Sequence, residues 1–105
     1  MIIIETSIFT RLVQDLFTDD EYRVLQYELI RHPDAGAVMS GSGGIRKIRW
    51  AGKGHGKRGG TRVIYYWAVS KEQILMLYIY PKNVKDDLSA DQIKVMRQIV
   101  KEEYE

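Results

Sequence analysis

The chain contains no cysteine among its 105 residues. Disulfide bonds, thiolate zinc sites, iron–sulfur clusters and a cysteine nucleophile are therefore excluded together. Histidine is nearly as scarce, since His32 and His55 are the only two, so we expect neither a transition-metal site nor a cofactor. A chain without cysteine is typical of the reducing cytoplasm, which is the location we predict.

Long apolar runs are also missing. No stretch approaches the roughly 20 apolar residues that cross a bilayer. The opening Met-Ile-Ile-Ile is followed at once by Glu5 and lacks the basic flank and long apolar region of a signal peptide. We therefore expect no membrane association. The length, and the absence of repeats or linkers, predict one domain over residues 1–105.

Acidic residues are absent between Asp34 and Glu72. Residues 35–71 hold eight lysines and arginines and so carry a charge of +8, although the whole chain carries only +2. The rest of the chain holds the other eight bases and all 14 acids, which gives it a net charge of −6. A concentrated basic segment favours a polyanionic partner, with nucleic acid as the first candidate.

Helix-start signals occur at three places. After a short predicted strand over residues 1–5, Thr6 is expected to cap a first helix. The capping-box sequence Thr18-Asp19-Asp20-Glu21 begins a second helix, which Pro33 ends. Another capping box, Ser89-Ala90-Asp91-Gln92, begins a C-terminal helix.

Three strands are predicted between the second and third helices, over residues 45–50, 62–69 and 74–80. A long Gly/Lys loop and a tight Ser-Lys-Glu-Gln turn link them, so we expect an antiparallel meander. The resulting order βααβββα predicts an α+β fold. We expect the two N-terminal helices and the C-terminal helix to pack on one face of a twisted, mainly antiparallel sheet.

Period-two alternation sorts the side chains of these strands into two faces. In the third strand it separates Leu75, Leu77 and Ile79 from Met76, Tyr78 and Tyr80. The more apolar sets are expected against the helices. The other face then collects cations and aromatic rings, namely Lys47, Arg49, Arg62, Tyr66, Tyr78, Tyr80 and Lys82. Such a face suits RNA, because cations bind phosphates and rings stack on unpaired bases; the alternative is an ordinary solvated face.

The loop AGKGHGKRGGT at residues 51–61 combines glycine with positive charge. A nucleotide-binding P-loop has Ser or Thr after its lysine and a helix next, whereas here Arg58 follows Lys57 and a strand follows the loop. We predict RNA or ribosome contacts for Lys53, His55, Lys57 and Arg58, with an unengaged hairpin tip as the alternative. A neutral His55 among cations is also compatible with accepting a proton.

The segments GGIRKIR at 43–49 and GKRGGTRVIYY at 56–66 closely resemble the RelE/HigB-type toxins of bacterial toxin–antitoxin modules, in particular the HigB-like branch. The similarity runs over nearly the whole chain. It implies a RelE-like fold and an mRNA interferase that enters the A site of the 70S ribosome and cleaves the message through attack of a ribose 2′-OH, without a metal. It also implies a HigA-like helix-turn-helix antitoxin, through which a toxin–antitoxin complex binds operator DNA.

Matching positions within this resemblance implies catalytic roles for Lys47, Arg49, Arg62 and Lys82. We expect Arg62 to clamp the scissile phosphate, Lys47 or Lys82 to transfer a proton, and Arg49 to stabilise the transition state. The chain lacks an arginine at position 82 and has a longer Gly/Lys hairpin than plain RelE proteins, so the general acid and base stay open.

Further contacts are implied for Arg46, as an RNA contact, and for Tyr66 or Tyr80, as a base-stacking ring. Tyr104 matches a C-terminal tyrosine that some family members place in the site, and capping of the core is its alternative role. Two other functions remain open at this point: a non-catalytic RNA- or DNA-binding module, and a corepressor that mainly binds its antitoxin.

Overall fold

The N-terminal part forms a strand and two helices, as predicted. The computed structural model describes residues 1–50, 60–82 and 87–105 and contains β1 (Ile2–Glu5), α1 (Ser7–Leu16) and α2 (Asp19–Arg31) in this part. Thr6 caps α1 by accepting the Phe9 N–H at 3.2 Å. Thr18 and Glu21 form the complete capping box of α2, in which each side chain accepts the other's backbone N–H.

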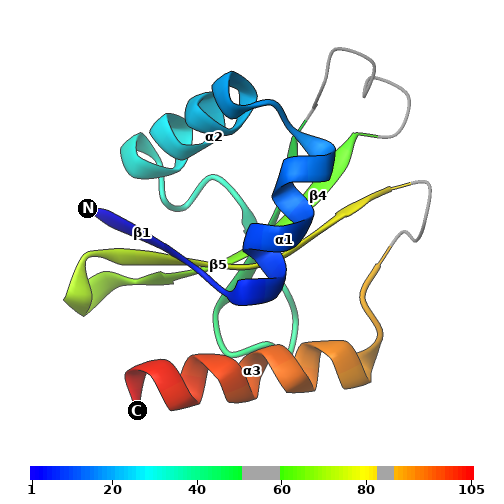
Figure 1. The fold of residues 1–105 in the computed structure, drawn as a ribbon. Helices are drawn as coiled ribbons and strands as arrows, with labels where there is room; N and C mark the ends of the chain where they lie inside the picture. Colours follow the sequence, from blue (N-terminus) through cyan, green and yellow to red (C-terminus); the bar gives the residue numbers. More distant parts are fainter. Residues whose placement is uncertain (51–59, 83–86) are drawn as a thin grey trace.

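The C-terminal part contains the predicted meander and helix. Its elements are β2 (Ala37–Val38), β3 (Ile45–Trp50), β4 (Thr61–Ala68), a 3₁₀ turn (Val69–Lys71), β5 (Gln73–Pro81) and α3 (Ala90–Tyr104). The strand order is β1-β5-β4-β3-β2, with β1 parallel to β5 and the other pairs antiparallel (Figure 1). The α+β fold is therefore confirmed. The short edge strand β2 is not among the predicted strands.

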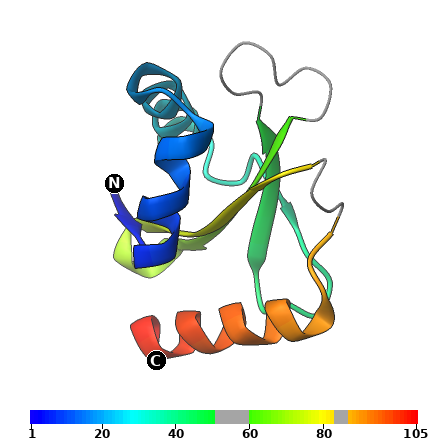
Figure 2. The same cartoon turned by 45° about the vertical axis from the view of Figure 1, so that its right-hand side comes forward.

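Helices cover both faces of the sheet, so the prediction that they share one face is wrong. Helices α1 and α2 pack on one face, whereas α3 runs along the opposite side of the molecule (Figure 2). The first face buries Phe9, Leu25, Leu29, Val63, Tyr65, Ile74, Met76 and Ile79. The second face buries Ile45, Ile64, Leu75, Leu77, Tyr80, Leu88, Met96 and Val100.

A β-bulge in β5 explains why both faces are apolar. Ile64 pairs with Tyr78, but the next residue of β4, Tyr65, pairs with Met76. Leu77 is therefore an extra residue on β5, and the alternation of side chains shifts by one position there. As a result Leu75 and Leu77 join Tyr78 on the α3 face, while Met76 joins the α1/α2 face. The expected alternation of the third strand is thus wrong on the N-terminal side of the bulge.

No helix in the described ranges is long and apolar enough to cross a membrane.

Candidate active site

Three of the predicted catalytic cations lie on neighbouring strands at one end of the sheet. Arg49 of β3 is directly opposite Arg62 of β4, and Lys47 is opposite Ile64. Because Ile64 belongs to the α3-side core, Lys47, Arg49 and Arg62 occupy the α3 face of the sheet. They lie beyond the part of this face that carries Tyr66 and Ile45. We call these three residues, together with Lys82, the cationic site.

Arg62 is the most deeply buried member of the cationic site. Only 5% of the residue is exposed, and within the described part of the chain its Nη1 atom is buried without a hydrogen-bond partner. Arginine does not lose its charge in proteins, so a buried guanidinium with an unpaired donor costs free energy. An anion that accepts from this donor would remove much of that cost, because hydrogen bonds to charged groups are the strong ones.

Lys82 lies at the same end of the sheet. It follows β5, and its backbone N–H donates to the carbonyl of Gly60 at 3.2 Å. Gly60 comes two residues before Arg62, and Tyr80, two residues before Lys82, is the register partner of Arg62. The structure therefore brings all four predicted catalytic residues to one end of the β3–β4–β5 meander.

Lys47 has an acidic partner that the sequence did not indicate. Its Nζ lies 2.6 Å from Oδ1 of Asp87, a residue 40 positions away that comes just before α3. A contact between a strand and a distant helix lead-in has no local pattern, so no signal in the sequence points to it.

The tyrosines predicted to stack on bases pack against other tyrosine rings. Tyr80 is only 3% exposed, and its ring packs 5.7 Å from that of Tyr78. The Tyr66 ring lies 5.7 Å from the ring of Tyr104, whose hydroxyl donates to Oε1 of Gln73 at 3.1 Å. Tyr66 is four residues from Arg62, roughly 13 Å along the strand, so the structure does not bring Tyr66 or Tyr104 to the cationic site. Burial raises the pKa of Tyr104.

Arg46 alternates with Lys47 and points to the opposite face. Its Nη1 donates to the carbonyl of Gly36 at 2.7 Å and to that of Asp34 at 3.3 Å. Tyr65, its register partner, holds the same loop by accepting the Gly36 N–H at 2.8 Å. These contacts give Arg46 a structural role in fixing the connection between α2 and β2.

The family follows from a comparison of the whole sequence with known protein families. Residues 1–105 match the family model described as the RelE toxin of the RelE/RelB toxin–antitoxin system. The chain belongs to the RelE toxin family. It is therefore the toxin of a toxin–antitoxin system, and an antitoxin is its partner.

The basic loop of this RelE-family toxin carries four further residues that the sequence predicts to contact RNA. Lys53, His55, Lys57 and Arg58 lie outside the described residues, so their RNA contacts stay predictions. In the described ranges, no three His, Cys, Asp or Glu side chains come close enough to hold a metal ion.

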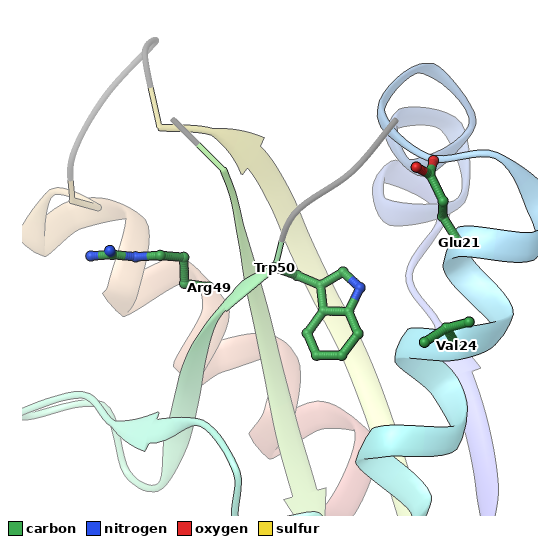
Figure 3. A pocket seen from close by; sticks show the side chains of 4 residues that line it. All are labelled: Glu21, Val24, Arg49 and Trp50. Atoms are coloured by element: carbon green, nitrogen blue, oxygen red, sulfur yellow. The ribbon is translucent and has the colours of Figure 1, made fainter. Parts of the chain in front are cut away.

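An open pocket of about 440 Å³ lies beside the cationic site of the RelE-family toxin, lined by Glu21 and Val24 of α2 and by Arg49 and Trp50 of β3. Trp50 points toward α2, whereas Arg49 points away from it, toward the other face of the sheet (Figure 3). Arg49 lines the pocket and also belongs to the cationic site, so the two adjoin at the end of β3.

Proposed function

We propose that this toxin is a ribosome-dependent mRNA endonuclease of the HigB-like branch, which blocks translation by cutting messages in the A site. The observation that supports the proposal best is the buried Arg62, whose Nη1 donor has no partner in the described part of the chain. A phosphodiester is the anion that an RNA supplies, and a guanidinium binds it with two parallel hydrogen bonds.

Arg62 and Arg49 together bind the scissile phosphate in this proposal. Side chains directly opposite each other on antiparallel strands have Cβ atoms about 5 Å apart, so two guanidinium groups reach one phosphate from β3 and β4. Negative charge grows on the phosphate oxygens when the 2′-OH attacks. Fixed cations in a half-buried site stabilise that charge more strongly than water does.

Proton transfer falls to Lys47 or Lys82. The attacking 2′-OH must lose its proton, and the 5′-oxygen must gain one as the P–O5′ bond breaks. The products are then a 2′,3′-cyclic phosphate and a 5′-hydroxyl, so the reaction is balanced without water or a metal. Lys47 and Lys82 come from β3 and the end of β5, and so approach the phosphate from different strands.

The proposal also includes the toxin's contacts with the ribosome, its antitoxin and its location. The loop cations Lys53, Lys57 and Arg58, with His55, contact ribosomal RNA. The antitoxin is HigA-like, contains a helix-turn-helix, neutralises the basic face with an acidic segment and links the complex to operator DNA. The proposed location is the cytoplasm, where ribosomes and messages are available.

The proposal is tested with purified toxin, 70S ribosomes and a defined message, with cuts mapped by primer extension. We expect codon-linked cuts that need the ribosome and persist after the toxin is pre-treated with EDTA. Arg62→Ala should abolish the cuts while the variant still co-sediments with ribosomes, and Arg11→Ala, an exposed arginine on α1, serves as the matched control. Ribosome binding without any cuts by the wild-type toxin would instead identify a non-catalytic RNA-binding module.

A further inference from the structure

The segment that leads into α3 places an acid against the cationic site. Oδ1 of Asp87 lies 2.6 Å from Nζ of Lys47, a distance at which a charge-assisted hydrogen bond forms. The residues that follow Asp87 are fixed in place. Leu88 is buried in the α3-side core with Met96, and Ser89 caps α3 by accepting the Gln92 N–H at 3.1 Å. Asp87 is thus presented from an anchored backbone.

Fold stability gives little reason for this ion pair. The Asp87 side chain is 72% exposed and that of Lys47 is 28% exposed. Ion pairs of such exposure contribute only a small part of the free energy of folding, because water and salt screen them.

Binding of a polyanion does not explain the Lys47–Asp87 ion pair either. A carboxylate on a surface that attracts phosphates cancels one of its cations and repels the ligand. The Asp87 carboxylate is useful at this position only if it controls where the Lys47 ammonium lies.

We propose that Asp87 is a positioning residue for RNA cleavage and acts through Lys47. The inference rests on the proposed nuclease function. A lysine ammonium sits on a flexible four-carbon stem and samples many positions. The Asp87 carboxylate holds it at one position on the same face as Arg49 and Arg62. Reacting groups must be held to within a fraction of an ångström for efficient chemistry, so loss of this restraint slows the chemical step.

This role predicts opposite effects on binding and on chemistry. Replacing Asp87 by asparagine removes a negative charge from the basic face, so affinity for the ribosome–message complex should stay the same or rise. The rate of the chemical step should fall about tenfold, since a misplaced catalytic group costs up to a hundredfold. A residue that merely stabilised the fold would not separate the two quantities.

The experiment measures single-turnover cleavage of message in preformed 70S complexes, together with equilibrium binding to the same complexes and thermal unfolding. Asp87→Asn is compared with Asp91→Asn, which removes the same charge four residues later, in the first turn of α3. We expect a slower rate with undiminished affinity for Asp87→Asn only. Asp87→Glu, which keeps the carboxylate, should recover part of the rate.

A double-mutant cycle with Lys47 tests whether Asp87 acts through that residue. In a Lys47→Ala background, which removes the partner of Asp87, Asp87→Asn should have no further effect on the rate. Three results overturn the inference: an unchanged rate in Asp87→Asn, an equal loss of rate with and without Lys47, or a loss of binding that accounts for the lost rate. If the wild-type toxin does not cleave, the proposed nuclease function is wrong. If the wild-type toxin cleaves and Asp87→Asn cleaves equally fast, only the positioning role of Asp87 is wrong.

Discussion

Arg49 and Arg62 are directly opposite each other on the antiparallel pair β3 and β4. Like charges in this relationship destabilise a sheet, and here one of the two is almost completely buried. An anion placed between them reverses the sign of the interaction. The arrangement is therefore unfavourable for the free toxin and favourable for its complex with a phosphodiester, as expected where activity conflicts with stability.

Replacing Arg62 with methionine should stabilise the free toxin. Methionine fills a similar volume without a charge, so the unfolding free energy should rise by about 1–3 kcal/mol. For a chain of this size, each kcal/mol raises the melting temperature by about 4–8 °C. Thermal unfolding of Arg62→Met beside Arg11→Met measures the effect. A lower melting temperature for Arg62→Met would show that the guanidinium is well satisfied in the free toxin.

Replacing Arg46 with alanine should destabilise the toxin and leave RNA cleavage largely unchanged. The Arg46 guanidinium donates to the carbonyls of Gly36 and Asp34, and a charged hydrogen bond contributes about 1.5–3 kcal/mol. We expect urea unfolding to show a loss of this size, while the cleavage rate at a temperature where the variant is folded stays near that of the wild type. A stable variant that binds ribosomes poorly would support the RNA contact predicted from the sequence instead.

Removal of the Tyr104 hydroxyl should leave cleavage intact. The hydroxyl donates to Gln73, and the ring packs against Tyr66 at a distance from the cationic site. Tyr104→Phe is expected to cleave within about twofold of the wild-type rate and to lose about 1 kcal/mol of stability. A loss of about a hundredfold in the single-turnover rate of a folded Tyr104→Phe variant would instead show that Tyr104 takes part in catalysis.

Tyr22 should make the fold sensitive to alkaline pH. Burial, followed by the hydrogen bond that its hydroxyl donates to Glu5, raises the pKa of Tyr22 far above its usual value of 10. The folded state thus holds this proton more tightly than the unfolded state. The resulting stability is fully present below about pH 10 and is lost as the pH rises toward the folded-state pKa. Chemical denaturation from about pH 8 to about pH 11, a range that spans the usual tyrosine pKa of about 10, should therefore show falling stability.

The variant Tyr22→Phe isolates this contribution. Phenylalanine cannot ionise, so the variant should be less stable at pH 8, because Glu5 loses a hydrogen-bond donor, and should lose less stability on going to high pH. An alkaline slope identical to that of the wild type would assign the effect to other tyrosines, of which Tyr65 also has a pKa raised by burial.

The sequence predicted the elements better than their arrangement. Capping boxes at Thr18 and Ser89 act through neighbouring residues, and both are present in the structure. The face on which α3 packs depends on the bulge at Leu77, which shifts the side-chain alternation without any glycine or proline to mark it. The apolar stripe of an amphipathic helix indicates that the helix packs on the sheet, but it does not indicate on which face.

The candidate site, too, was predicted only in part from the sequence. Strand alternation predicted that Lys47, Arg49 and Arg62 share a face, since this depends only on local geometry, and the register of β3 and β4 places them together. Alternation does not predict burial, so Tyr80 was expected to be open to a base and is covered by the α3-side core. The contact of Asp87 with Lys47 joins residues 40 positions apart and required the folded structure.

Single-turnover cleavage of a ribosome-bound message should be compared for the wild-type toxin and for Arg62→Met, each pre-treated with EDTA and then separated from it before the ribosomes are added. We predict that the wild-type toxin cuts within the A-site codon. Arg62→Met, although more stable and still bound to the ribosome, should cut at least about a hundredfold more slowly, the order of loss expected when a donor to transition-state charge is removed. Equal rates for the two proteins, or loss of wild-type cleavage after the toxin alone has been pre-treated with EDTA, would contradict metal-independent catalysis that depends on Arg62.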